Sequence, residues 1–227
     1  MTGGRAGDVF GPLALSLELA FVTTLLLLVI ATPIAWWLSR SRAPWKPVVQ
    51  AVVALPIVLP PTVLGFYLLI LLGPYQPPGS WWFTLTGETL TFSFAGLVIA
   101  SCVYSLPFAV QPLQAAFDLV GDGEIEAART LGATARDAFF SIAVPLAAPG
   151  FLAAAVLSFA HTLGEFGVVL MVGGNIPGET RVVSIAIFDH VETLNYGAAH
   201  ELSSLLLALA FAFLLLMYVA NRRRRRS

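Results

Sequence analysis

Charged residues are scarce in this chain of 227 residues, since 11% of the residues are charged whereas 58% are hydrophobic. Cysteine occurs once, as Cys102, which excludes a disulfide within the chain. Lysine also occurs once, as Lys46, and the residues before it do not form the glycine-rich loop that cradles nucleotide phosphates. The chain therefore cannot be a P-loop ATPase.

Long hydrophobic runs dominate the sequence. A run of about 18 or more apolar residues is long enough to cross the hydrocarbon core of a bilayer as a helix. The runs predict an all-α polytopic membrane protein with five transmembrane helices, at residues 11–38, 48–72, 91–115, 144–172 and 200–220. The first run is too long for a signal-peptide core, so we expect it to be a retained span.

The basic residues predict the orientation of these spans. They gather after the first, third and fifth spans: Arg40, Arg42, Lys46, Arg129, Arg136 and Arg222 to Arg226. The positive-inside rule therefore predicts an outer N-terminus and a cytoplasmic C-terminus. The terminal arginine run directly follows the last span, which favours an anchor to anionic membrane lipids over a nucleic-acid patch. We expect no nucleic-acid partner.

A polar segment, Glu126 to Gly132, interrupts the hydrophobic sequence within the loop 116–143. Such a segment cannot lie in hydrocarbon, so it must protrude. Asp122 is expected to cap a short helix that Gly132 stops, and Thr134 with Asp137 is expected to cap a second helix. The pattern predicts a helix-turn-helix elbow. Small side chains on its first helix suit insertion into a groove of a soluble protein, although a merely solvated loop is the alternative: Ala127, Ala128 and Leu131.

Three prolines lie in the second predicted span, at Pro56, Pro60 and Pro61. Each lacks an amide donor and disturbs the preceding helical turn, which frees backbone carbonyls. Free carbonyls are tolerated in a membrane where they face protein or a water-filled route. The span is therefore a candidate border of a permeation path, and a kink that only improves packing is the alternative.

The fourth predicted span contains polar residues at spacings of three and four, which place them on one helical face: Ser158, His161, Thr162 and Glu165. An ionisable residue inside a membrane is a functional candidate. A catalytic zinc site usually needs three protein ligands, so we expect no metal at His161 and Glu165. We expect Glu165 to order the turn around Gly164 and Gly167, by accepting backbone amides or pairing with His161 or Arg181.

The region 173–199 is too polar to cross the membrane, because apolar residues after Arg181 are soon interrupted by Asp189, His190 and Glu192. It predicts an outer loop with a short helix at the membrane face.

Several stretches resemble those of known families. Glu126-Ala127-Ala128, Gly132 and the later Ile142, Val144 and Pro145 resemble the EAA motif of binding-protein-dependent ABC importer permeases. The stretches His161 to Gly167, Gly174 to Arg181 and Leu55 to Pro61 look like the molybdate permease subunit, and sulfate permeases share parts of them. The resemblance implies the type I ABC importer permease fold. It also implies that Glu126, Ala127, Ala128 and Gly132, with Leu131 beside them, form a coupling helix.

The resemblance further implies a bacterial or archaeal membrane and a homodimer whose interface carries molybdate inward. The expected partners are two cytoplasmic ATP-binding subunits, which hold ATP and magnesium, and an extracytoplasmic molybdate-binding protein. The chain itself is expected to bind no cofactor and to catalyse no covalent chemistry. Tungstate or sulfate is the alternative cargo. A more remote alternative, an ion-coupled secondary transporter, usually shows internal repeats, and no convincing repeat is present.

Overall fold

The computed structural model describes residues 3–224, and within this range all regular secondary structure is helical. Arg225 and Arg226, at the end of the predicted lipid anchor, lie outside the described residues. The helices are α1 (Gly3–Arg40), α2 (Lys46–Val58), α3 (Pro61–Leu72), α4 (Gly79–Thr86), α5 (Phe94–Asp118), α6 (Asp122–Thr130), α7 (Ala135–Ala138), the π-helix η1 (Phe139–Ala143), α8 (Val144–Leu146), α9 (Ala148–Leu163), α10 (Gly167–Gly173), α11 (Val183–Glu192) and α12 (Tyr196–Arg224). The expected all-α architecture is confirmed.

The core forms where α1, α5 and α9 pack together. The buried residues of α1 recur every three or four positions and so line one face: Leu27, Ala31, Ala35 and Leu38. Small residues allow α5 and α9 to approach closely. A Cβ added at Gly150 of α9 would lie 2.3 Å from the Cβ of Ala116 on α5. Contacts between small residues of this kind are the usual way in which membrane helices pack.

Within residues 3–224, three helices are each long and apolar enough to cross a membrane: α1, α5 and α12. Two further crossings result if each bent pair of helices counts as one span. The first pair is α2 with α3, bent by 111°, and the second joins residues Ala135–Leu146 to α9 with a bend of 68°. The predicted spans 48–72 and 144–172 are therefore interrupted helices rather than continuous ones.

The interruption between α2 and α3 has a local cause. Leu59 is extended, with φ −72° and ψ 137°, and Pro60 and Pro61 follow it. A residue that precedes proline avoids the helical conformation, and proline has no amide to continue the ladder. Proline is well suited to the first turn of a new helix, where Pro61 begins α3. The consecutive prolines thus end one helix and begin another.

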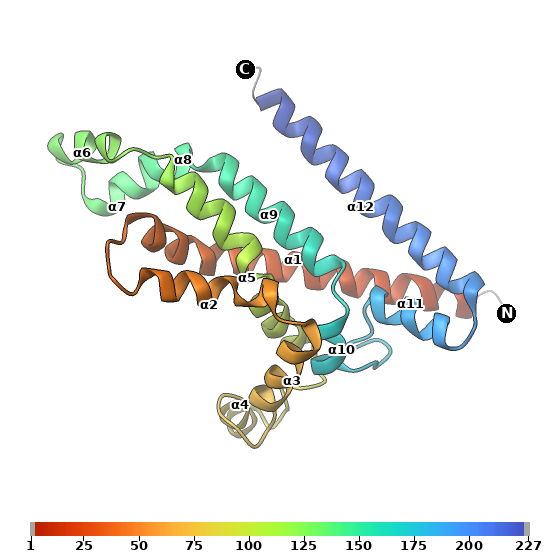
Figure 1. Cartoon of the computed structure of the whole chain (residues 1–227). Helices are drawn as coiled ribbons and strands as arrows, with labels where there is room; N and C mark the ends of the chain where they lie inside the picture. The colour runs from red at the N-terminus through yellow and green to blue at the C-terminus, as the bar shows by residue number, and fades with distance from the viewer. Residues whose placement is uncertain (1–2, 225–227) are drawn as a thin grey trace.

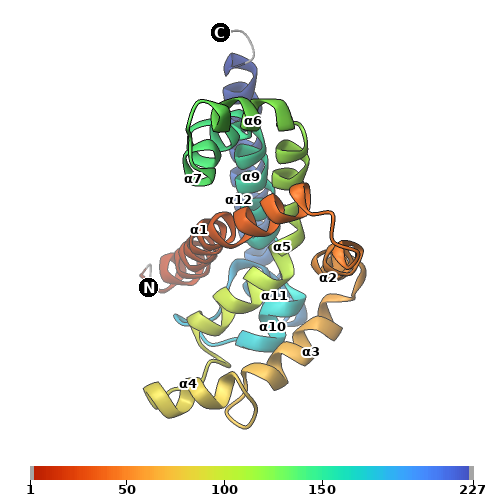
Figure 2. The ribbon, with the colours of Figure 1, turned by 90° about the vertical axis from the view of Figure 1, so that its left-hand side faces the viewer.

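Several helices project from the core toward different ends of the molecule. α6 and α7 project together at one end of α1, whereas α11 lies beside the other end (Figure 1). The side view places α3 and α4 opposite α6 and α7 (Figure 2). α12 leans away from the core, and 11% of its apolar window is buried, against 50% for α5. Its apolar surface therefore requires lipid or another subunit beside it.

Candidate functional site

The helix α6 contains the Glu-Ala-Ala segment and begins without a side-chain cap. Its N-cap residue is Gly121, and Asp122 occupies the first helical position. The expectation that Asp122 caps this helix was wrong, because its carboxylate forms an ion pair with Arg40 at the end of α1. Asp122 and Glu124 still lie in the first turn, where negative charge interacts favourably with the helix dipole.

The helix α6 ends at a glycine, as predicted. Gly132 has φ +93°, a conformation that side chains disfavour. Its amide donates to the carbonyl of Arg129 at 3.0 Å, and the amide of Ala133 donates to the carbonyl of Ala128 at 3.0 Å. These two bonds form a Schellman motif, which satisfies the last carbonyls of the helix.

A capping box starts the second arm of the elbow. The Thr134 hydroxyl accepts a hydrogen bond from the Asp137 amide at 3.2 Å, and the Asp137 carboxylate accepts from the Thr134 amide at 3.1 Å. The Thr134 hydroxyl also donates to this carboxylate, and its hydrogen bond and that of the amide lower the pKa of Asp137. The predicted capping box, and with it the helix-turn-helix elbow, is confirmed.

The surface of α6 is open. None of its residues is buried in this chain; Glu126 and Ala127 are exposed and Ala128 is half-buried. Leu131, immediately after the helix, is 89% exposed. A large apolar side chain that stands in water on a protruding elbow is suited to contact with another protein.

The predicted span 144–172 is interrupted a second time after α9, at Gly164 to Phe166, and this break lies against the one between α2 and α3. Gly167, the first residue of α10, lies against Pro61, the first residue of α3, and an added Cβ would be 2.6 Å from the proline Cβ. One turn further along α3, a Cβ at Gly65 would be 2.8 Å from the Cβ of Met171. Broken helices carry free backbone groups, which membranes tolerate where they face protein or a water-filled cavity. This junction is the candidate border of a path.

A cluster of polar side chains joins α5 to the C-terminal end of α9, a few residues before Gly167. The Ser105 hydroxyl lies 2.9 Å from His161 Nδ1 and 3.0 Å from the Thr162 hydroxyl. The His161 ring stacks on Phe108, with ring centroids 3.9 Å apart. Ser158 and Thr162 are buried. Three of the predicted polar residues thus lie on the part of α9 that is followed by the break.

Glu165 lies beyond the end of α9, so it does not continue the helical face of Ser158 and Thr162. Its side chain is 5% exposed, and among the described residues its carboxyl oxygens have no hydrogen-bond partner. The expected pairing with His161, Arg181 or backbone amides was therefore wrong. The main-chain carbonyl of Glu165 instead accepts from the Ser184 hydroxyl at 2.5 Å. A buried carboxyl without a partner is costly, so Glu165 remains a functional candidate.

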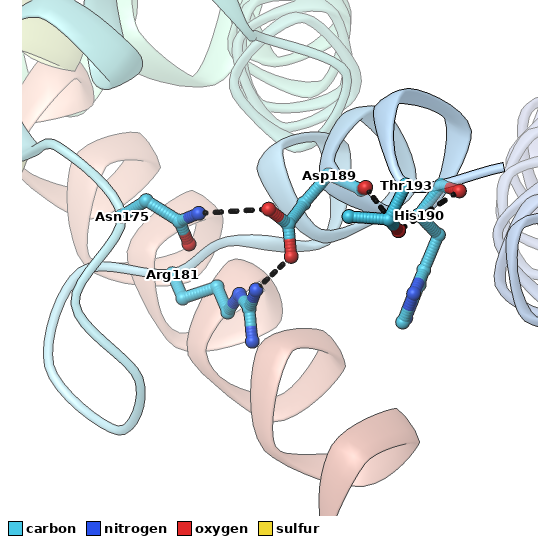
Figure 3. Close-up of polar contacts among 5 residues, drawn as sticks. All are labelled: Asn175, Arg181, Asp189, His190 and Thr193. Carbon is cyan, nitrogen blue, oxygen red and sulfur yellow. Dashed lines mark hydrogen bonds and ion pairs between the residues drawn. The ribbon is translucent and has the colours of Figure 1, made fainter. Parts of the chain in front are cut away.

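Arg181 instead braces the loop between α10 and α11. It forms an ion pair with Asp189 on α11, and the Asn175 side-chain amide lies 3.4 Å from the other oxygen of this carboxylate (Figure 3). The Thr193 hydroxyl donates to the main-chain carbonyl of Asp189 at 2.8 Å, near the end of the same helix. These contacts hold the segment before α11 against the short helix.

No group of three or more metal-binding side chains comes together within residues 3–224. A hollow of about 720 Å³ lies between α1 and the segment α7–η1, and its walls are mainly apolar: Leu28, Val29, Pro33, Phe139 and Phe140. Thr32, Trp36 and Arg136 also line the hollow and carry its few hydrogen-bond donors.

The geometry can be compared with known proteins. A family described as the binding-protein-dependent transport system inner membrane component matches residues 28–226. The chain belongs to this family. As a permease of this kind, it shares 57% identity over 208 residues with the molybdenum transport system permease protein ModB of Azotobacter vinelandii, covering 92% of both chains.

Two further relatives show how far the similarity of the permease extends. It is 35% identical over 202 residues to the sulfate transport system permease protein CysT of Escherichia coli K12, covering 89% of this chain and 72% of that protein. It superposes on a chain of the inward-facing MetNI methionine ABC transporter with a TM-score of 0.76, covering 98% and 99% of the two chains at 19% identity. The last likeness shows the fold of the permease.

The structure brings some predicted site residues of the permease together and keeps others apart. Residues 126–132 share the elbow, whereas Pro61 and Glu165 lie at the two breaks. Pro56 is buried within α2, and Pro60 precedes α3. Sequence reasoning missed Ser105, which bonds His161 and Thr162. The signal was present, because Ser101 and Ser105 are four residues apart in an otherwise apolar span and so share one face.

Proposed function

We propose that this permease translocates molybdate inward, driven by ATP hydrolysis on separate ATP-binding subunits. The observation that carries the proposal is the exposed elbow of α6 and α7 on a chain that is 57% identical to a ModB permease. The lower identity to the sulfate permease, 35%, favours molybdate over sulfate as cargo. Tungstate, which has the same charge and shape, is an outcome that the experiment must separate.

The assembly we propose is a homodimer with two cytoplasmic ATP-binding subunits and an extracytoplasmic molybdate-binding protein. ATP and magnesium belong to the ATP-binding subunits, and this chain catalyses no covalent chemistry. Glu126, Ala127, Ala128, Leu131 and Gly132 form the coupling surface. Closure of the ATP-binding subunits moves this surface, and the two spans with breaks rearrange, which gives alternating access. Basic residues after the odd-numbered spans support a cytoplasmic elbow and C-terminus.

The path we propose lies along the junction of the two breaks and is shared with the second copy. Described residues at this junction carry no Lys or Arg, so it holds a dianion weakly and allows release. Glu165 would repel a dianion if ionised, so it is not a direct ligand of the cargo. Capture and selection of the oxyanion belong to the binding protein.

The test is uptake of radioactive molybdate into liposomes that contain the permease, its ATP-binding subunit and its binding protein. ATP-dependent uptake that tungstate inhibits and sulfate does not supports a molybdate permease, and direct uptake of labelled tungstate shows whether both anions are carried. Preferential sulfate uptake would assign the chain to the sister class. Uptake that persists without ATP and follows an ion gradient would contradict the importer.

A pair of variants links uptake to the coupling surface. Ala127→Trp places a bulky side chain on the exposed face of α6 and should abolish ATP-dependent uptake while the permease still inserts into the membrane. Ala135→Trp makes the same change at an exposed position on the other arm of the elbow and serves as the control. Equal loss of uptake in both variants would show that the effect is not specific to the coupling surface.

A further inference from the structure

The last two turns of α1 contact both ends of the coupling loop, residues 116–143. The Trp36 ring packs edge-on against Phe117, near the start of the loop, with centroids 5.2 Å apart and planes at 79°. The same ring packs against Phe139, near the end of the loop, at 5.0 Å and 68°. One side chain of the first span thus bridges the segments that enter and leave the elbow.

Arg40 lies one helical turn after Trp36 and extends this contact to α6 itself. Its guanidinium donates a hydrogen bond to the carbonyl of Val120 at 2.7 Å and forms an ion pair with Asp122, the first residue of α6. The guanidinium carbon also lies 4.8 Å from the centre of the Trp36 ring, within the range of cation–π attraction. Trp36 and Arg40 together form a clamp on the coupling loop.

Little else holds α6 to the body of the protein. Ile125 packs partly buried against the core, but no residue of α6 is fully buried. Among the described side-chain and turn hydrogen bonds of residues 122–133, only the one from Arg40 reaches an element outside the coupling loop. α6 also packs against α7 and η1 of the same loop, so the Ile125 contact and the ion pair set its position relative to the body of the protein.

We propose that the clamp makes α1 part of the coupling device, so that motion of α6 is passed directly to the first span. This inference deepens the proposed function, on which it rests, because it assigns the clamp a role in the same coupling. The chemistry suits arginine, since a planar guanidinium presents several donors in fixed directions and can serve a carbonyl and a carboxylate together. Lysine has a point charge and cannot reproduce this arrangement.

Arg40 is a positioning residue. Its test therefore measures both the ATPase rate and the molybdate transported per ATP in the reconstituted complex. In Arg40→Ala the ATPase rate should persist, while molybdate transported per ATP falls about tenfold, the effect of losing a charge-assisted hydrogen bond. Arg40→Lys should recover only part of the loss. Arg42→Ala is the matched control, because Arg42 lies two residues away and forms no ion pair within the described part of the chain.

A charge exchange tests the ion pair itself. Arg40→Asp and Asp122→Arg should each uncouple transport, and the double variant should recover part of it, because the ion pair is restored with opposite polarity while the hydrogen bond to the Val120 carbonyl is not. The proposal would be overturned if neither the double variant nor Arg40→Lys transported more molybdate per ATP than the uncoupled single variants. This holds even if the single variants assemble poorly. Equal effects of Arg40→Ala and Arg42→Ala would overturn it as well.

Hydrogen–deuterium exchange of the amides in residues 122–130 gives a readout that does not depend on the cargo. Faster exchange in Arg40→Ala than in Arg42→Ala supports the clamp even if the wild-type complex carries a different anion. Unchanged exchange in Arg40→Ala contradicts the clamp even if the wild-type complex imports molybdate. Failure of the clamp and failure of the proposed function are thus distinguished.

Discussion

At the scale of single residues, the contact between Gly167 and Pro61 leaves no room for a side chain. A Cβ at Gly167 would lie 2.6 Å from the Cβ of Pro61, which sits in a rigid ring and cannot turn aside. We expect Gly167→Ala to lower the stability of the permease by about 1–3 kcal/mol, the usual cost of overpacking. Thermal unfolding in detergent measures this effect.

Gly11→Ala is the control for this substitution. Gly11 lies in α1 with no atom within 4 Å of an added Cβ, and alanine favours helix more than glycine does. This variant should therefore be as stable as the wild type or more so. If Gly167→Ala is equally stable, the breaks do not pack as closely as the structure shows.

A second prediction concerns pH at the capping box. Hydrogen bonds from Thr134 lower the pKa of Asp137, so the ionised carboxylate is favoured in the folded elbow. Stabilisation from this group is complete above the ordinary pKa of aspartate, about 4, and is lost as the pH falls through the lowered value. Hydrogen exchange of the α7 amides, corrected for intrinsic rates, should show less protection near pH 3 than near pH 6.

Asp137→Asn provides the comparison for the pH experiment. It should reduce protection near pH 6 and remove the part of the pH dependence that comes from this carboxyl. A pH dependence that is the same in the variant and the wild type would assign the effect to other groups.

Residue patterns predicted local contacts better than distant ones. The capping box of Thr134 and Asp137 was predicted because its bonds join residues three apart. The partner of Asp122 was not, because the ion pair joins residues 82 positions apart in sequence. Glu165 shows a third case, since the helical spacing that placed it beside Ser158 fails where α9 ends at Leu163.

At the scale of elements, the elbow predicts where the ATP-binding subunit gains apolar contact. Leu131 is almost fully exposed, and burial of a leucine contributes about 1.5–3 kcal/mol. We expect Leu131→Ala to weaken binding of the isolated ATP-binding subunit roughly tenfold or more. Titration of that subunit onto the detergent-solubilised permease measures the affinity.

Leu207→Ala on α12 is the matched control, because Leu207 is also exposed but lies far from the elbow along the chain. Its affinity for the ATP-binding subunit should equal that of the wild type. A normal affinity in Leu131→Ala would exclude Leu131 from the contact surface.

Helix type was predictable from composition, but helix continuity was not. Apolar runs indicated five spans, and the structure divides two of them by sharp bends. Pro60 and Pro61 signalled the first bend, although the sequence predicted one span over residues 48–72 rather than two helices. The second bend, at Ala147, lies between Pro145 and Pro149 and so carried a comparable signal. The further break at Gly164 to Phe166 lacks one, because it contains no proline and glycine alone tolerates many conformations.

At the scale of the whole molecule, the orientation can be tested with single cysteines. In a Cys102→Ala background, we expect Tyr75→Cys to react with a membrane-impermeant maleimide in intact spheroplasts, and Leu119→Cys to react only after permeabilisation. Both side chains are about nine-tenths exposed, at 91% and 88%, so access to the reagent depends on the side of the membrane. The reverse pattern would invert the proposed topology.

The packing of α1 on α5 and α9 also has a consequence for biosynthesis. α1 ends at Arg40, whereas α9 is complete only at Leu163, so about 120 residues separate the first span from one of its main partners. At bacterial or eukaryotic translation rates of 5–20 residues per second, α1 waits roughly 6 to 25 s for that partner. Until α5 is complete at Asp118, the nascent first helix has to remain in the lipid by its own hydrophobicity, which its long apolar run makes possible.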